Sequence, residues 1–187
     1  MNTRKEKWDL SPINYIVMET SKWAIDNAHS EIQFKVKHLV ISTVTGQFKS
    51  FTGSIEAEND SFENARVSLE VDLTSVDTNQ ADRDNHLRSE DFFAVERFPK
   101  MTFSGVYTQG KLKGELSIKG TSKEISLDVD FNGIAKDPWG NTKAGFEVSG
   151  TINRKDFGLA WNAITEAGGM LVAEDVKIIA NVQFAKA

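Results

Sequence analysis

Apolar and polar residues alternate along eight stretches of this chain, and each stretch is apolar on one face only. In the clearest stretch, Ile125, Leu127, Val129 and Phe131 are separated by polar residues. A repeat of two is typical of a β-strand with one dry face and one wet face. Eight such strands predict an all-β fold, an eight-stranded antiparallel barrel whose interior can hold one small apolar ligand.

Short segments rich in turn-forming residues separate these stretches, which favours hairpin connections. The stretches begin near Ile32, Val44, Val67, Met101, Leu112, Ile125, Phe146 and Val176. The strongest turn signals are Gln109-Gly110, Gly120 to Lys123, and Asp137 to Asn141. In the second stretch the apolar residues move from even to odd positions at Lys49-Ser50, which predicts a β-bulge there.

Residues 74–98 lose the repeat of two and predict a short helical excursion. Asp77 or Thr78 would cap a helix that runs to about Arg88. Two pairs of opposite charge lie four residues apart on this helix and would form surface ion pairs. The pairs are Asp84 with Arg88, and Asp82 with His86.

Residues 154–173 interrupt the strands a second time and predict a turn followed by a short helix that ends at Gly168-Gly169. Residues 1–22 are polar and aperiodic, and we expect an N-terminal arm there. The remaining residues, 23–187, form one barrel domain. They contain neither an internal repeat nor a low-complexity stretch.

Composition narrows the function classes. The 187 residues carry a net charge of −5 without a basic stripe, which argues against nucleic-acid binding. The chain has no cysteine, so it forms neither a disulfide nor a sulfur-ligated metal site. Its histidines, His29, His38 and His86, are too widely spaced for a dense ligand motif. We therefore expect neither a metal site nor a cofactor.

Hydropathy gives the expected location. The chain has no apolar run of the roughly 20 residues that a membrane-spanning helix needs, so stable membrane insertion is not expected. The first 22 residues also lack the apolar core of a secretory signal. We expect a cytoplasmic location. A periplasmic protein whose signal had been removed would look the same.

The inward face of the barrel is the first candidate for a binding site. From the pattern alone, this face could be a packed core or the wall of a ligand tunnel. His38 lies in phase with Phe34 and Val36, and could be a hydrogen-bonded core residue or a polar contact near a tunnel mouth. The candidate lining residues are Phe34, Val36, His38, Phe48, Leu69, Val71, Phe103, Leu116, Leu127, Val129, Phe146, Val148 and Trp161.

The first excursion supplies candidate contacts to a polar headgroup. Arg83, His86 and Arg88 lie close together in the sequence. Arginine suits phosphate and carboxylate because its planar fork donates two hydrogen bonds. The segment could therefore form a lid that faces a headgroup, or it could simply plug and brace the barrel.

Several local motifs occur in an order typical of one family. They are WAIDNAHSEIQFKVKHL, TVTGQF, TNQADRDNHLRSEDFF, FPKMTF, GTSKEISL and NRKDFG. Over residues 23 to 185 the chain resembles the YceI-like family, bacterial polyisoprenoid-binding proteins of lipocalin-like shape. The resemblance implies an apolar tunnel that holds a long isoprenoid or fatty chain, and it implies binding or carriage, not catalysis.

Two other function classes stay open. One is an enzyme that acts on a lipid or isoprenoid, with His38 or the cluster from Arg83 to His86 in the chemistry. The other is a protein-interaction barrel with a filled core, which could be a homodimer. Most outward positions are charged, although Leu39 and Ile179 are apolar exceptions that could mark a contact surface.

Overall fold

The computed structural model describes residues 20–164, 166 and 168–187. Most of the expected N-terminal arm therefore lies outside the described residues. Ser21 and Lys22, the last two residues of that expected arm, already belong to the first strand of the barrel.

The described chain consists mainly of β-strands. The strands are β1 (Ser21–Ile25), β2 (Glu31–His38), β3 (Ser42–Phe48), β4 (Phe51–Ala57), β5 (Arg66–Asp72), β6 (Val76–Asp77), β7 (Lys100–Thr108), β8 (Lys111–Ile118), β9 (Thr121–Lys136), β10 (Thr142–Asn153) and β11 (Val172–Lys186). The helices are α1 (Ala81–Arg88) and the 3-10 turns η1 (Asn27–His29), η2 (Leu73–Ser75) and η3 (Arg154–Phe157).

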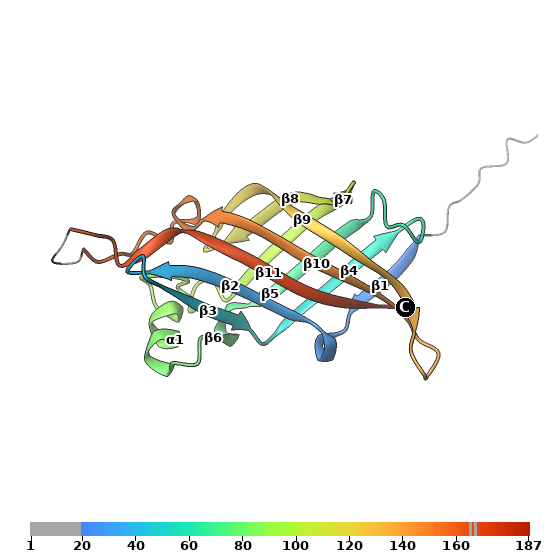
Figure 1. The fold of residues 1–187 in the computed structure, drawn as a ribbon, viewed down its shortest axis with the longest axis horizontal. Coiled ribbons are helices and arrows are strands. Elements are labelled where there is room, and N and C mark those ends of the chain that lie inside the picture. Colours follow the sequence, from blue (N-terminus) through green and yellow to red (C-terminus); the bar gives the residue numbers. More distant parts are fainter. Residues whose placement is uncertain (1–19, 165, 167) are drawn as a thin grey trace, which may run out of the picture.

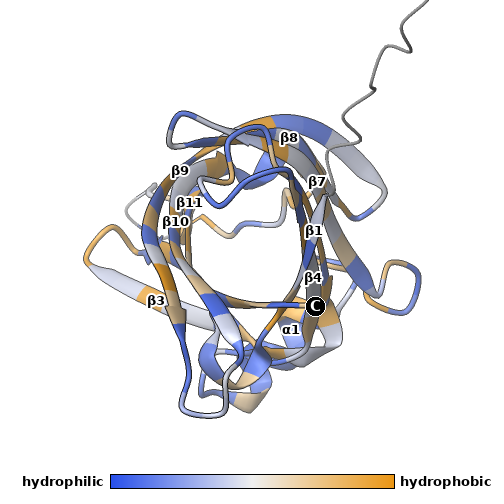
Figure 2. Ribbon diagram, turned by 90° about the vertical axis from the view of Figure 1, so that its right-hand side faces the viewer, coloured by the Kyte–Doolittle hydropathy of each residue, from blue (hydrophilic) through white to orange (hydrophobic). Residues whose placement is uncertain are grey.

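These strands make eight passes of a closed antiparallel barrel, as the alternation predicted (Figures 1 and 2). Three passes are interrupted, namely β1 with β2, β3 with β4, and β5 with β6. The ring runs in the order β1-β4-β5-β7-β8-β9-β10-β11, and β11 returns to pair with β1 at Trp23 and Lys186. Further along, β11 pairs with β2 instead.

The predicted phase slip at Lys49-Ser50 is the break between β3 and β4. Its two exposed amides are satisfied by the hydroxyl of Ser75, which accepts from the amides of Lys49 and Ser50 at 3.1 and 3.0 Å. Phe48 and Phe51 flank the break and are both buried. The slip therefore lets both halves of one long pass direct their aromatic side chains into the barrel.

Both excursions lie at the same end of the barrel, which we call the α1 end (Figure 1). The β2–β3 turn, residues 78–99, the β8–β9 turn and the described part of residues 154–171 lie there, because each connects strand ends that are paired at that edge. The opposite end carries the β4–β5 loop, the β9–β10 turn and the C-terminus, and we call it the C-terminal end.

The helix of the first excursion ends at Arg88 as predicted, but its cap and its ion pairs are different. Gln80 is the capping residue and accepts a hydrogen bond from the Arg83 amide. Asp84 is buried and accepts from the amide and the hydroxyl of Thr78 at 2.8 and 2.5 Å, so it does not pair with Arg88. The expected Asp82–His86 pair is also wrong, since the His86 ring contacts another carboxylate, Asp91, at 2.8 Å.

The helix expected before Gly168-Gly169 is also wrong. The second excursion begins with the 3-10 turn η3, and the described residues from 158 to 171 form no helix. The physical reason is that side chains hold the backbone groups of this loop. Asn162 Oδ1 accepts from the amides of Leu171 and Val172, each at 3.1 Å, and Arg154 donates to the carbonyls of Leu159 and Trp161.

Asp26 joins β10, β11 and the 3-10 turn η1 at the place where β11 changes partner. Its carboxylate lies 2.8 Å from Lys143 Nζ on β10 and 3.1 Å from His29 Nδ1 in η1, and its amide donates to the carbonyl of Gln183 on β11. The hydrogen bond from Lys143 is the main reason that the pKa of Asp26 falls from 3.8 to about 2. The carboxylate therefore stabilises the folded protein above pH 3.8.

We expect Asp26→Asn to lower the free energy of unfolding by about 1–2 kcal/mol at pH 7. The loss should shrink as the pH falls from 3.8 to about 2, because the wild-type carboxylate itself becomes protonated over that range. Urea unfolding across this range measures both effects. A loss that stayed constant with pH would show that the charge of Asp26 is not the cause.

Candidate ligand-binding cavity

The C-terminal end of the barrel is closed by aromatic side chains. Phe62, in the β4–β5 loop, is only 1% exposed and lies inside the barrel. Its ring centroid is 5.0 Å from Trp23, 5.2 Å from Phe131 and 5.1 Å from Phe146. Phe146 also contacts Phe184. We call this closely packed cluster the aromatic floor, because it closes the interior at this end.

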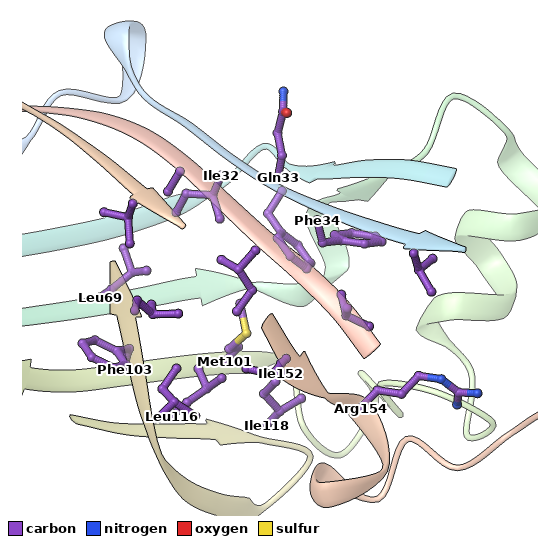
Figure 3. Close-up of a pocket in the computed structure, with 18 of the residues that line it drawn as sticks. Ile32, Gln33, Phe34, Leu69, Met101, Phe103, Leu116, Ile118, Ile152 and Arg154 are labelled. Atoms are coloured by element: carbon purple, nitrogen blue, oxygen red, sulfur yellow. The ribbon is translucent and has the colours of Figure 1, made fainter. Parts of the chain in front are cut away.

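An apolar cavity of about 360 Å³ lies between this floor and the α1 end. Phe34, Leu69, Met101 and Ile152 point into it (Figure 3). Each of these side chains remains partly exposed, although each faces the inside of a closed barrel. Inward residues keep such exposure when facing atoms do not fill the space between them. The barrel is therefore not a uniformly packed core.

Glycine makes room for one large side chain in the wall. A Cβ atom on Gly46 would lie 2.2 Å from the Phe34 ring, which crosses the face of β3 at that point. Phe34 also packs against Phe48, with ring centroids 5.6 Å apart. Gly46 therefore leaves room for the far end of the Phe34 ring, which any larger side chain at this position would displace.

Nearly all of the predicted lining residues border this cavity. They are Phe34, Val36, His38, Phe48, Leu69, Phe103, Leu116, Leu127, Val129, Phe146, Val148 and Trp161. Val71 does not. It lies between Phe51 and Met101 in the sheet register and is fully buried in the packed core, so it does not reach the cavity surface.

Two of the three predicted headgroup residues also border the cavity, at the α1 end. Arg83 does so while donating to the hydroxyl and the carbonyl of Thr78 at 2.7 and 2.8 Å, and His86 lies beside it. Arg88 does not border the cavity. Its guanidinium is used to brace α1, because it donates to the carbonyls of Thr74 and Val76, both at 2.9 Å.

An aromatic contact joins the two excursions across the α1 end. The His86 ring lies 4.6 Å from Trp161 and 5.1 Å from Phe92, and Phe92 lies 5.4 Å from Trp161. His86 comes from the first excursion and Trp161 from the second. The three rings thus form an aromatic cluster that connects the two excursions. All three rings border the cavity.

His38 lies at the same end, because it is the last residue of β2 and pairs with Val172 of β11 and Ser42 of β3. It is partly exposed and borders the cavity. The structure therefore places His38, Arg83, His86 and Trp161 around one mouth, although they are far apart in the sequence.

Sequence reasoning missed Arg154, a buried cation at this mouth. Its side chain is 3% exposed and borders the cavity, on one side of the apolar residues (Figure 3). It donates to the carbonyls of Ala173 and Trp161 at 2.8 and 2.9 Å, and also to those of Val172 and Leu159. Burial lowers the pKa of the Arg154 guanidinium, while the nearby charge of Glu174 opposes this shift.

No carboxylate of the described residues lies within ion-pair distance of Arg154, so its hydrogen bonds go to backbone carbonyls, while Glu174 acts on its charge only from a longer distance. The sequence signal was an arginine directly after a long alternating strand, followed by an aspartate and a glycine. Phe62 was missed as well. Its signal was a single aromatic residue within an otherwise polar loop.

Residues 20–164, 166 and 168–187 contain no group of three or more histidine, aspartate or glutamate side chains that could hold a metal ion. In the same part of the chain, no helix is both long enough and apolar enough to cross a bilayer.

Comparisons with known proteins agree on one family. A family model described as a YceI-like domain matches residues 23–184. A UPF0312 protein of Staphylococcus epidermidis is 41% identical over 166 residues, which is 88% of this chain and 97% of that protein. The crystal structure of a YceI protein of Campylobacter jejuni is 31% identical, has a TM-score of 0.69, and is matched over 81% of this chain and 90% of that chain.

A more distant structure shares the fold. A domain from Saccharophagus degradans, described as a polyisoprenoid binding domain, has a TM-score of 0.67 at 14% identity. The match covers 88% of this chain and 98% of that chain. At this identity the likeness shows the barrel architecture alone.

Arg154→Lys should loosen the loop that forms one side of the mouth. A lysine ammonium cannot reach four carbonyls from one position, so we expect the free energy of unfolding to fall by about 2 kcal/mol. Limited proteolysis should cut residues 158–171 faster. Lys155→Arg, a conservative change in an exposed ion pair with Glu174, is the control and should change stability little. Equal effects of the two variants would contradict this role of Arg154.

Proposed function

Because the chain belongs to the YceI-like family, we propose that its barrel binds a long-chain amphiphile and carries or sequesters it without chemical change. Candidate ligands are a polyisoprenoid, a quinone or a fatty-acid-like lipid. The apolar cavity, closed at one end by the aromatic floor, is the observation that carries this proposal. Its volume of about 360 Å³ falls within the range of small-molecule pockets.

An alkyl or prenyl tail suits this cavity for a simple reason. Burying each CH₂ group contributes roughly 0.8 kcal/mol, so about ten methylenes offset the entropy lost when a flexible tail is immobilised. The tail would extend toward Phe62, and its head would remain at the α1 end. Affinity for the tail then depends on apolar area and shape rather than on hydrogen bonds.

The polar mouth favours an acidic or strongly polar head. Arg83 and Arg154 both border the cavity there, and their hydrogen bonds go to Thr78 and to backbone carbonyls. Neither group has a carboxylate of the described residues within ion-pair distance, so their positive charge would attract a carboxylate or a phosphate. His38 and His86 lie at the same mouth and offer further hydrogen bonds to a head of either kind.

Binding is favoured over catalysis by the way that the mouth histidines are used. His86 Nε2 is in contact with Asp91, and its ring is packed against Phe92 and Trp161, which suits a structural junction. An enzyme acting on the bound lipid is the alternative, since a paired histidine and carboxylate beside a cavity could also exchange protons. A protein-interaction barrel would have a filled core, and the cavity counts against it.

Mass spectrometry of organic extracts of the purified protein tests this proposal directly. We expect one long-chain lipid at near-stoichiometric amount, recovered unchanged after incubation. Release of a modified lipid would favour the enzyme. The absence of any lipid, together with no fluorescence change of a long-chain probe, would contradict binding.

Ala180→Phe should block the tail site. Ala180 lies on the inner face of β11 and borders the cavity, so an added ring would occupy space that the tail needs. We expect the Kd of a fluorescent fatty-acid probe to rise at least about ten-fold, while stability is kept or raised. Ile179→Phe, which places the same ring on the other face of β11, is the control and should leave the Kd unchanged. Equal affinities of both variants would contradict a tail in this cavity.

Arg83→Gln tests the position of the head. Arg83 is exposed but donates two hydrogen bonds to Thr78, so its replacement should lower the free energy of unfolding by only about 1 kcal/mol. We expect weaker binding of a long-chain fatty acid by about three- to ten-fold, but unchanged binding of the alcohol with the same chain, because only the acid carries a charge. Arg97→Gln removes another exposed cation, one that pairs with Glu90 and does not border the cavity, and should affect neither ligand. Equal losses for acid and alcohol would contradict a charge contact at Arg83.

A further inference from the structure

The α1 end carries a group of exposed apolar side chains that we call the apolar rim. Its members are Leu39, Val40, Ile41, Ile164 and Met170. Val40 is 80% exposed, Ile41 85% and Ile164 78%, so these three bury almost nothing in the folded protein. Isolated surface apolar residues are ordinary, but adjacent apolar loop tips mark a contact surface.

Two segments that are far apart in the sequence form the rim. Residues 39–41 are the turn between β2 and β3, whose last pair is His38 with Ser42. Ile164 and Met170 form an isolated bridge within the second excursion. The Leu39 amide donates to the carbonyl of Leu171 at 2.9 Å, which holds the two segments together at one edge of the barrel.

The turn is also strained. Leu39 and Val40 have φ angles of 51° and 64°, in the left-handed region. A β-branched valine rarely adopts this conformation, whereas asparagine or glycine adopts it readily. Folding thus gains nothing from valine at this position, either from burial or from backbone conformation. Such a costly choice at a loop tip points to a function of the exposed side chain.

The rim continues into the wall of the cavity. His38 and Leu171 both border the cavity, and they are the immediate neighbours of Leu39 and Met170 in the chain. The opposite end offers no such path, because the aromatic floor closes it. A lipid tail could pass from Met170 on the rim to the cavity over the adjacent apolar side chain of Leu171.

Charge does not supply the attraction. The chain has a net charge of −5, and the exposed Glu166 lies in sequence between Ile164 and Met170. None of the five rim residues carries a positive charge, and the cations Arg83 and Arg154 border the cavity instead, so we do not expect acidic headgroups to draw the rim itself to a membrane. Apolar contact is the interaction that these residues can supply, and it depends little on salt.

From these observations we propose that the apolar rim docks the barrel, mouth first, on a lipid bilayer, so that the ligand moves between the membrane and the cavity. This inference rests on the proposed function, since only a lipid ligand needs such a route. Residues 39–41, together with Ile164 and Met170, would enter the apolar part of the bilayer surface, while the charged outer wall of the barrel stays in water.

Co-sedimentation of the whole protein with phosphatidylcholine vesicles tests the proposal. The rim variant is Val40→Asn with Ile41→Ser, and it should fold normally because asparagine suits the left-handed turn. We expect its vesicle partition coefficient to fall at least ten-fold, since transfer of one aliphatic side chain into hydrocarbon is itself worth about ten-fold. Trp139→Ser is the matched control. Trp139 is 84% exposed in the turn at the C-terminal end, and its loss should change partition less than about two-fold.

Salt and lipid charge give a second measurement. Partition of the unaltered protein should change less than about two-fold between about 0.1 and 1 M sodium chloride. Phosphatidylglycerol added to the vesicles should not increase it. A strong rise with acidic lipid, or a loss with salt, would show that charges drive the contact and would overturn docking through the apolar rim.

Probe binding in solution separates the two proposals. A fluorescent fatty acid delivered from solvent should bind the rim variant with unchanged Kd, while transfer of the same probe from vesicles should be at least ten-fold slower. Normal binding in solution without vesicle association would overturn the docking inference alone. Loss of solution binding by the unaltered protein would overturn the proposed function as well. A dimer that the rim variant converts to monomers would show that a second copy covers the rim instead.

Discussion

The hydrogen-bond ladder along β11 is the interaction on which the rest of the structure depends. This one strand pairs with β10 along one edge and with both β1 and β2 along the other. It thereby closes the barrel and leaves no long sheet edge open. Asp26 lies where β11 changes partner, and its contacts to Lys143 and Gln183 tie that changeover to the neighbouring strands.

Closure also sets the size of the interior, and the side chains fill that interior unevenly. Five aromatic rings pack the C-terminal end, where Phe62 enters from a loop. Toward the α1 end, aliphatic side chains such as Leu69 and Ile152 leave space between them. Because of this unequal filling, the C-terminal end of the interior is closed by the aromatic floor and the mouth of the cavity lies at the α1 end. The proposed direction of the ligand, tail inward and head outward, follows from this asymmetry.

The mouth is built from chain segments that are not strands. His86 and Trp161 join the two excursions, and Arg154 holds the second one through backbone carbonyls. His86 and Arg154 use their side-chain nitrogens to contact neighbouring groups of the protein, namely Asp91 and the carbonyls of the second excursion. The same segments place Arg83 at the cavity and carry the apolar rim beside it. Support of the mouth, recognition of a head and contact with a membrane would thus share one end of the barrel.

Local sequence determined the parts of this protein that depend on near neighbours. The repeat of two located all eight strand passes, and the change of phase at Lys49-Ser50 located the break between β3 and β4. The motif order indicated the family, which the family match confirms. The end of α1 at Arg88 could also be predicted, since helix boundaries depend on residues close in the chain.

Tertiary structure alone decided what depends on distant residues. Asp84 binds Thr78 rather than Arg88, because burial of the carboxylate requires hydrogen bonds that a surface ion pair could not provide. Alternation placed Val71 and Leu69 on the same face, yet only Leu69 reaches the cavity. The repeat shows which side chains face inward. Whether an inward side chain packs against other atoms or borders the cavity depends on closure of the barrel and on the loop that inserts Phe62. Neither feature can be predicted from the local pattern.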